Sequence, residues 1–338
     1  MSTPGTRFHV STPNAPGAIA VIDLVGDVTF ALAALGADDV PVGRPVVRRL
    51  GELDEAVVVR WSEQRAQVLP HAGPHVVRAI SSTLVAAGVA EASDVDPCEL
   101  YPEAADAIEA HMLDALARAE SPAAVSALLS QPSRWHDADW ASIDVNTATR
   151  RTQELARLID APVVVAVGPP NVGKSTLTNA LAAEAVSIVA DAPGTTRDHV
   201  GVSIELPTSI GGFVIHWIDA PGIRSGDQVS AIEAEAISIA RDVVRGANLV
   251  LSCGDADHGF LPAASIEPPS ATPVITVGLK ADLARIEPCD LCVSGATGEG
   301  LDALGEMIRR TLISDDAMRW DGPWHFHPAL DWPGSPRG

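Results

Sequence analysis

Short apolar runs alternate with amphipathic segments from Pro162 onward. The β-branched runs predict buried strands, and the segments between them have the 3.6-residue spacing of helices. The predicted strands cover residues 163–168, 199–206, 213–220, 248–255 and 273–279, and the predicted helices cover 173–185, 230–246 and 301–312. Strands that alternate with helices are typical of a mostly parallel sheet with helices on both faces. We therefore expect an α/β domain over residues 161–313.

The first hundred residues have a different pattern. Compact apolar runs at 17–26, 55–61 and 66–71 predict strands, and the apolar spacing over 75–89 predicts a helix. This combination favours a small α+β domain over residues 1–100.

A short helical connector is expected over residues 101–160. The alanine-rich stretch 102–130 has apolar positions near the helical period and Pro102 at a plausible first helical position, which predicts one or two helices. A polar stretch with two tryptophans follows, and then a predicted helix over 145–159. Residues 314–338 are rich in Trp and Pro, which indicates an irregular tail that could pack on another domain.

Composition fits a folded protein of two or three domains, because 46 % of the 338 residues are apolar and 20 % are charged. The formal net charge of −21 argues against a dedicated nucleic-acid binder, although it leaves a local basic patch open. The N-terminus lacks the pattern of a signal peptide, and the apolar runs are too short to span a bilayer. We therefore expect a cytoplasmic protein. Four cysteines do not make a disulfide scaffold.

Lysine is almost absent from this chain. Only two of the 23 basic side chains are lysines, Lys174 and Lys280, and arginine supplies the rest. Lys174 belongs to "GPPNVGKS", Gly168 to Ser175, which fits G-x-x-x-x-G-K-[ST] between a predicted strand and a predicted helix. In this motif backbone N–H groups cradle phosphates, the lysine reaches the β- and γ-phosphates, and the hydroxyl lies on Mg²⁺. A compact ammonium fits such a loop better than a wide guanidinium does.

Four later stretches sharpen this assignment, and two of them, "PGTTRD" and the one that holds Asp282, weaken the alternative of an ATP-dependent P-loop kinase or ATPase. "PGTTRD" contains Thr195 and Thr196, "DAPG" runs from Asp219 to Gly222, and "GLKAD" carries Lys280 and Asp282; "SGATGEG" follows the next predicted strand. With the phosphate loop, these motifs resemble the Era/EngA/MnmE branch of P-loop GTPases in order and spacing, over roughly residues 160–312.

The resemblance implies roles for individual residues. Thr196 would coordinate Mg²⁺ when the γ-phosphate is bound, Asp219 would hold Mg²⁺ through water, and the Gly222 N–H would sense the γ-phosphate. Asp282 would accept both N–H groups of the guanine edge, and Lys280 would lie along the base. The nucleotide-binding set that the resemblance implies is Gly168, Asn171, Val172, Gly173, Lys174, Ser175, Thr176, Thr195, Asp219, Gly222, Lys280, Asp282, Ser294 and Gly295.

Two departures from the motif set affect binding and catalysis. Leu279 stands where the family has asparagine, so we expect weaker guanine binding with selectivity kept by Asp282, since each lost hydrogen bond is worth on the order of 1 kcal/mol. Ile223 follows "DAPG", where other GTPases have a water-orienting glutamine. In MnmE-like proteins Asn171 would instead help bind K⁺, and Glu233, with Glu235 next, would orient the water indirectly. A solvated helix face is the alternative for these glutamates.

The start of the chain also resembles the MnmE family. The segments "STPNAPGAIAVIDLVGD" and "LPHAGPHVVRAISSTLVAAG" are similar to two stretches of its N-terminal domain. In that family the domain dimerises and binds a folate one-carbon donor, and the enzyme works with a flavoprotein, MnmG, on the wobble uridine of tRNA. The resemblance therefore implies a homodimer, an MnmG-like partner and indirect contact with tRNA.

Other stretches of the MnmE family have no counterpart here. The stretch "P-G-E-F-T-x-R-A-F-x-N-G-K" is missing, the long helical domain is reduced to a few helices, and the terminal "C-[IL]-G-K" is absent. The resemblance therefore implies a shortened MnmE-like GTPase. The alternative is a GTP-regulated dimerisation or interaction module without the tRNA modification chemistry.

Several cysteine and histidine positions are assigned no chemistry. Cys289 and Cys292 form a single C-x-x-C without a second pair, which argues against zinc or redox use. Cys253 is interpreted as a strand core residue. For His71 and His75, surface or capping roles are favoured over lining a folate pocket. His325 and His327 in the tail lack further ligands for a metal.

Overall fold

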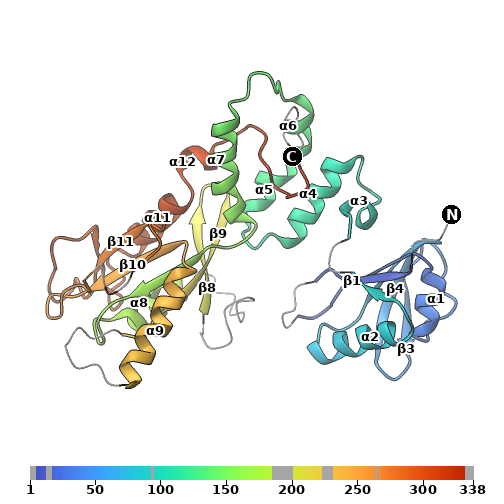
Figure 1. Cartoon of the computed structure of the whole chain (residues 1–338), viewed down its shortest axis with the longest axis horizontal. Coiled ribbons are helices and arrows are strands. Elements are labelled where there is room, and N and C mark those ends of the chain that lie inside the picture. Colours follow the sequence, from blue (N-terminus) through green and yellow to red (C-terminus); the bar gives the residue numbers. More distant parts are fainter. Residues whose placement is uncertain are drawn as a thin grey trace. The chain divides into compact units, whose positions relative to one another are not determined.

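The computed structural model describes residues 5–12, 17–92, 95–184, 201–222, 231–262, 265 and 267–331, with only the backbone described at 184 and at 231–237. The chain divides into two compact units, Met1–Asp114 and Ala115–Gly338, and each is described by itself. Figure 1 labels many of the helices and strands of both units.

The N-terminal unit is built on a six-stranded sheet in the order β3-β4-β5-β2-β1-β6. Neighbouring strands are antiparallel except for β1 and β6, which are parallel. The strands are β1 (Arg7–Val10), β2 (Ile22–Val25), β3 (Val46–Leu50), β4 (Asp54–Ser62), β5 (Arg65–Leu69) and β6 (Ala90–Glu91). The predicted strands at 17–26, 55–61 and 66–71 correspond to β2, β4 and β5.

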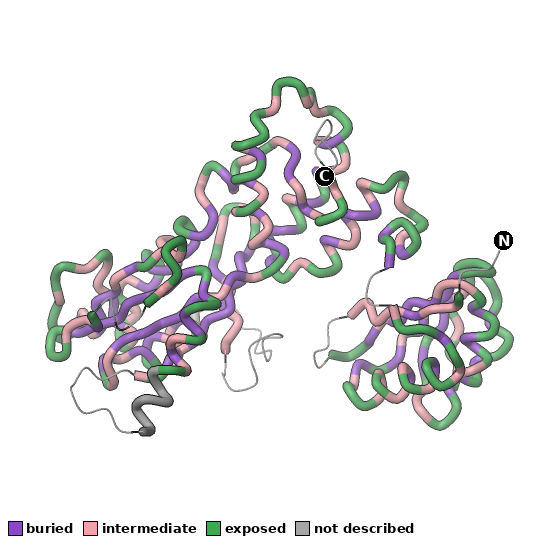
Figure 2. The backbone as a smooth tube through the Cα atoms, in the orientation of Figure 1, coloured by how far each residue is buried: buried purple, intermediate pink, exposed green. Residues whose placement is uncertain are grey.

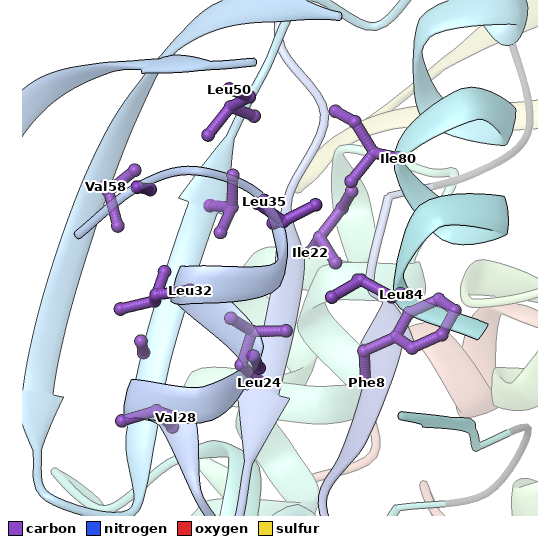
Figure 3. Packing of buried hydrophobic residues seen from close by; sticks show 14 of the residues in the cluster. Phe8, Ile22, Leu24, Val28, Leu32, Leu35, Leu50, Val58, Ile80 and Leu84 are labelled. Atoms are coloured by element: carbon purple, nitrogen blue, oxygen red, sulfur yellow. The ribbon is translucent and has the colours of Figure 1, made fainter. Parts of the chain in front are cut away.

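Two helices cover one face of this sheet, α1 (Val28–Ala34) and α2 (Pro74–Ala86). Asp27 caps α1 by accepting a hydrogen bond from the Phe30 N–H, and Pro74 suits the first turn of α2 because its missing N–H is not needed there. Figure 3 shows apolar side chains of both helices and of the sheet packed together. A separate small α+β domain is thereby confirmed.

The C-terminal unit contains a second six-stranded sheet, in the order β12-β11-β10-β7-β9-β8. All neighbouring strands are parallel except β8 and β9, which form an antiparallel pair at one edge. The strands are β7 (Val163–Val167), β8 (Gly201–Thr208), β9 (Gly211–Asp219), β10 (Leu249–Gly254), β11 (Val274–Gly278) and β12 (Leu291–Cys292). Figure 2 shows the central strands as largely buried, which explains their continuous apolar runs.

Helices cover both faces of this second sheet. Helix α9 (Ala231–Arg245) packs on the face that carries Val165 and Ile218. Helix α8 (Lys174–Glu184) lies on the opposite face, where the Trp217 Nε1–H donates a 2.9 Å hydrogen bond to the Thr178 hydroxyl. Helix α11 (Leu301–Leu312) also contacts the sheet, through β8 and β10. The predicted α/β domain is therefore confirmed.

Short helices precede this domain in the chain. They are α3 (Pro97–Leu100), α4 (Ala107–Arg118), α5 (Ala123–Leu129), α6 (Gln131–Asp137) and α7 (Val145–Leu155), which a 3₁₀ turn (Ala156–Leu158) extends. The expected helical start at Pro102 is wrong: residues 102–106 form turns and bends, and the helix begins at Ala107, where the Asp106 carboxylate accepts from the Glu109 N–H.

The chain after α12 (Asp315–Met318) lies against this helical segment. The Trp135 Nε1–H donates to the Trp324 carbonyl, and the Trp324 N–H donates to the Gln131 side chain, both at 3.2 Å. Trp324 is almost fully buried and meets Phe326 edge to face. The tail up to residue 331 is thus irregular but packed.

Among the described helices, none combines the length and hydropathy needed to cross a membrane.

Candidate nucleotide-binding site

The predicted phosphate loop connects β7 to α8 at the carboxyl end of the central strand. Asn171 and Gly173 adopt left-handed backbone conformations, with φ of 65° and 108°, which bend the chain tightly before the helix. Gly168 lies against β10 so closely that a Cβ atom there would sit 2.3 Å from the Cys253 carbonyl oxygen. Both motif glycines are therefore required by the backbone path.

The Lys174 side chain folds into this loop. Its ammonium donates hydrogen bonds to the carbonyl oxygens of Gly168, at 3.3 Å, and Pro169, at 3.0 Å. Only 7 % of the residue is exposed. Burial lowers the pKa of the ammonium, while the nearby Asp219 carboxylate acts in the opposite direction. The positive charge is thus held inside the loop, where phosphate oxygens would approach.

Ser175 and Asp219 form the second part of the site. The Ser175 hydroxyl at the start of α8 donates a 2.7 Å hydrogen bond to Oδ2 of Asp219, at the end of β9. The other carboxylate oxygen, Oδ1, is buried and has no hydrogen-bond partner among the residues that the structure describes. A hard divalent cation prefers oxygen ligands of this kind, so the arrangement fits Mg²⁺ held by the hydroxyl and, directly or through water, by the carboxylate.

Gly222 lies beside the phosphate loop. A Cβ atom at this position would come within 2.7 Å of the Pro170 Cα, so only glycine lets the two segments approach this closely. The structure therefore brings the "DAPG" motif and the loop together, as the sequence predicts. Thr195 and Thr196 lie outside the described residues. Glu233 and Glu235 belong to helix α9, but the structure describes only their backbone and not their side chains.

Asp282 follows β11 and is held by Ser294. The Ser294 hydroxyl donates a 2.5 Å hydrogen bond to Oδ1 of Asp282, and Ser294 itself is fully buried. The Ser294 hydroxyl oxygen in turn accepts hydrogen bonds from the N–H groups of Ala296 and Thr297, at 3.3 and 3.2 Å, which fixes the "SGATGEG" turn. The exposed carboxylate is thereby oriented before any base arrives.

Gly295 fixes the position of this turn against α8. A Cβ atom on Gly295 would lie 2.9 Å from the Thr176 carbonyl oxygen and 3.0 Å from the Leu177 nitrogen. Within the loop and helix, Val172 is buried, whereas Thr176 is exposed. The predicted binding residues at 168–176 and 279–295 therefore converge at one end of the sheet.

Lys280 spans the two halves of the site. Its backbone is left-handed, with φ of 57°, and its ammonium donates to the Asn171 carbonyl oxygen at 2.8 Å. The aliphatic stem lies over Gly173, where an added Cβ would meet the Lys280 Cγ and Cε atoms at 3.8 Å. The ammonium also donates to Oδ2 of Asp255 at 2.7 Å.

Leu279 is buried beside the same glycine. A Cβ atom on Gly173 would lie 3.9 Å from the Leu279 Cδ1, so the leucine makes an apolar contact with the phosphate loop. Its backbone N–H donates to the Gly254 carbonyl oxygen at 2.7 Å. The side chain at this position therefore fills space between the two loops without a hydrogen bond.

The sequence motifs do not predict a role for Asp255. It follows β10, is buried, and accepts from the His258 N–H and Nδ1 at 2.8 Å as well as from Lys280. Burial by itself would raise the pKa of its carboxyl group, but the hydrogen bonds from Lys280 and His258 outweigh that effect and bring the pKa to about 2. The available signal was an aspartate directly after a buried strand of the parallel sheet.

The structure gives the surroundings of the cysteines and histidines to which the sequence assigns no chemistry. Cys253 is fully buried in β10, and burial raises its pKa to about 12. The sulfurs of Cys289 and Cys292 lie 3.3 Å apart, and no group of three potential metal ligands occurs among the described residues. The exposed His71 is bound to Asp54 through Nδ1 at 2.8 Å, and neither His71 nor His75 lines the cavity that Val77 and Val85 of α2 border.

Comparison with known families identifies the class. Residues 163–277 match the family described as 50S ribosome-binding GTPase, MMR_HSR1. This match covers β7 to β11, and with the phosphate loop and the Ser175–Asp219 pair it defines a P-loop GTPase domain, a GTP-binding and GTP-hydrolysing enzyme domain.

Known proteins of similar sequence narrow this class. The chain is 39 % identical over 185 residues to "tRNA modification GTPase MnmE" of Acidiphilium cryptum, covering 54 % of this chain and 39 % of that protein. It is 31 % identical over 278 residues to the MnmE of Sphingopyxis alaskensis, covering 77 % of this chain and 57 % of that protein. The chain is therefore an MnmE-like P-loop GTPase that spans about half the length of these relatives.

Among solved structures, a crystal structure of Aquifex aeolicus Era bound to GDP and AlF4⁻ is similar at 29 % identity. The alignment covers 45 % of this chain and 56 % of that chain, with a TM-score of 0.35.

Proposed function

We propose that this protein hydrolyses GTP to GDP and phosphate with Mg²⁺ and acts as an MnmE-like switch in the modification of the tRNA wobble uridine. The observation that supports this most strongly is the convergence of three groups. They are the Lys174 ammonium inside the loop, the Ser175–Asp219 pair with one unpaired carboxylate oxygen, and the Asp282 carboxylate oriented by Ser294.

The phosphate end would bind charge in two ways. Lys174 would release its hydrogen bonds to loop carbonyls and donate to the β- and γ-phosphates, with the loop N–H groups and the start of α8 adding positive potential. Mg²⁺ would neutralise developing charge between the phosphates when bound. Ser175, Asp219 and Thr196 would hold the ion, and the Gly222 N–H would contact the γ-phosphate.

The base end would select guanine. A carboxylate accepts from the two adjacent N–H groups of the guanine edge, and adenine offers no such pair of donors. The Asp282 carboxylate is available for this role, with Lys280 along the base and the backbone at Ser294 and Gly295 near the exocyclic oxygen.

Hydrolysis would use Asn171 and Glu233. Asn171 is exposed in the left-handed turn of the loop, where its amide oxygen could coordinate K⁺ beside the phosphates. K⁺ would supply positive charge in the transition state, and Glu233 of α9 would orient the attacking water indirectly. Release of phosphate is expected to be faster in K⁺ than in Na⁺, and equal rates would remove Asn171 from this role.

The N-terminal unit would support dimerisation and the binding of a folate one-carbon donor. It contains a cavity of about 630 Å³ between α2 and the strands, which is within the size range of small-molecule sites. Val77 and Val85 provide an apolar wall, and the Arg78 guanidinium could pair with a carboxylate.

The molecules that bind to this protein distinguish the proposal from its alternative. A protein active in tRNA modification would work in the cytoplasm with an MnmG-like flavoprotein and contact tRNA indirectly. The net charge of −21 favours the alternative, a GTP-regulated dimerisation or interaction module that has lost the modification chemistry. Recovery of the flavoprotein with the tagged chain would support the first role, and a nucleotide-dependent dimer that recovers neither flavoprotein nor tRNA would support the second.

Calorimetry with GDP and ADP tests the nucleotide assignment itself. The proposal predicts that GDP binds at least a hundredfold more tightly than ADP, since the adenine edge would leave Asp282 unpaired. Equal affinity for the two nucleotides would contradict it.

A further inference from the structure

A chain of contacts links the base-recognition loop to the phosphate loop. The Lys280 ammonium lies between the Asp255 carboxylate, at 2.7 Å, and the Asn171 carbonyl oxygen, at 2.8 Å. Lys280 and Asn171 both have left-handed backbones, with φ of 57° and 65°, which side-chain-bearing residues rarely adopt. One hydrogen bond thus joins two strained turns from opposite halves of the site.

Asp255 is the fixed end of this chain of contacts. It is 1 % exposed, and its second oxygen is occupied by the His258 N–H and Nδ1, both at 2.8 Å. Its backbone carbonyl also accepts from the Gly259 N–H at 2.9 Å, which closes the turn after β10. The carboxylate cannot turn away from Lys280 without breaking these bonds.

The neighbouring side chain provides no polar alternative. Leu279 contacts Gly173 of the phosphate loop only through aliphatic carbon, as described above. Of the two neighbouring side chains, Leu279 and Lys280, it is therefore Lys280 that makes a hydrogen bond to the phosphate loop.

We infer that Asp255 is a positioning residue for the nucleotide site: it holds Lys280 against the phosphate loop and so couples base recognition to phosphate binding. This inference rests on the proposed function and extends it to a residue outside the motif set. Without the carboxylate, the flexible four-carbon stem of Lys280 samples many rotamers, and ordering it on the base costs entropy at every binding event.

Asp255→Asn tests this role, because the amide keeps the shape of the side chain and removes its charge. The Kd for GDP is expected to rise about tenfold, since a hydrogen bond to a charged group is lost. Asp257→Asn is the matched control: it makes the same charge change at an exposed position of the same turn and should leave the Kd within twofold.

Two double-mutant cycles separate positioning from a general structural effect. Lys280→Met alone and Lys280→Met with Asp255→Asn should give the same Kd, because Asp255 acts through the ammonium. Leu279→Asn should improve GDP binding by less than threefold in the parent and by about tenfold in the Asp255→Asn variant, because the new amide supplies the missing connection to the loop. Additive effects in both cycles, or no change on Asp255→Asn, would overturn the inference.

The parent protein distinguishes the failure of this inference from that of the proposed function. If the parent binds no GDP, the proposed function is wrong. If it binds GDP tightly and the Asp255→Asn variant binds equally well, the function stands and the positioning role is wrong.

Discussion

Ser175 and Asp219 are joined by one hydrogen bond, which uses only one of the two carboxylate oxygens of Asp219. The Ser175 hydroxyl donates to Oδ2 of Asp219 at 2.7 Å, while Oδ1 is buried and no described residue bonds to it. A buried carboxylate oxygen without a donor is costly, and a bound cation removes that cost. A cation site therefore gives a physical reason for the Ser175 hydroxyl and the Asp219 carboxylate to meet where the two sequence motifs come together.

Asp219→Asn is expected to weaken the dependence of GTP binding on Mg²⁺. The amide keeps the shape but loses the charge that holds the cation, so the gain in affinity caused by Mg²⁺ should fall at least tenfold. Titration of GTP with and without Mg²⁺ measures this gain. Asp290→Asn is the control, because that carboxylate bonds to Thr276 instead; an unchanged Mg²⁺ dependence in Asp219→Asn would exclude the cation site.

Ser294→Ala is expected to weaken GDP binding about tenfold, because Asp282 loses the donor that orients its exposed carboxylate. Binding of ADP should not change, so the selectivity for guanine falls by the same factor. Thr297→Ala, at an exposed position of the same turn, is the control. Competition binding of the two nucleotides gives both numbers, and an equal loss for GDP and ADP would instead indicate a misfolded turn.

The lowered pKa of the Asp255 carboxyl group predicts how the free energy of unfolding depends on pH. Its carboxyl pKa is about 2 in the folded protein because of Lys280 and His258, compared with about 3.9 in an unfolded chain. A lowered folded pKa stabilises the protein above pH 4, and that stabilisation disappears as pH falls toward 2. The difference in unfolding free energy between the parent and Asp255→Asn should therefore shrink as pH falls from 4 toward 2 in denaturant titrations. A difference that stays the same over this range would contradict the assignment.

Trp324→Ala is expected to destabilise the C-terminal unit by about 3 kcal/mol, the cost of removing a fully buried aromatic side chain. Leu129→Ala removes an exposed apolar side chain from helix α5 of the same unit and should stay within about 0.5 kcal/mol of the parent. Chemical denaturation followed by tryptophan fluorescence compares the two. Equal, small losses would mean that the tail does not pack on the helices.

The sequence predicted most of the second sheet because its strands are buried on both faces and read as continuous apolar runs. Strand β1 and helix α1 were not predicted, since four to seven residues carry too little periodicity. The motif residues were found because backbone geometry dictates them, as at Gly168 and Gly222. The role of Asp255 was not predicted, because it depends on a contact with Lys280, 25 positions further along the chain. No local sequence pattern indicates that these two residues meet.

The domain and tail assignments illustrate a second limit. Pro102 fits the first turn of a helix by its chemistry, yet the helix begins at Ala107, where Asp106 provides a cap for the Glu109 N–H. The packing of Trp324 against α6 joins positions nearly two hundred residues apart. Such long-range contacts follow from the finished fold and not from any single segment of the sequence.

Nucleotide binding by Lys174→Ala tests the central claim most directly. The ammonium is held inside the phosphate loop by the Gly168 and Pro169 carbonyl oxygens, and it is the positive charge of that loop. The account predicts that the variant folds, as circular dichroism would verify, and binds GTP at least a hundredfold more weakly than the parent. A folded variant that binds GTP as tightly as the parent would contradict it.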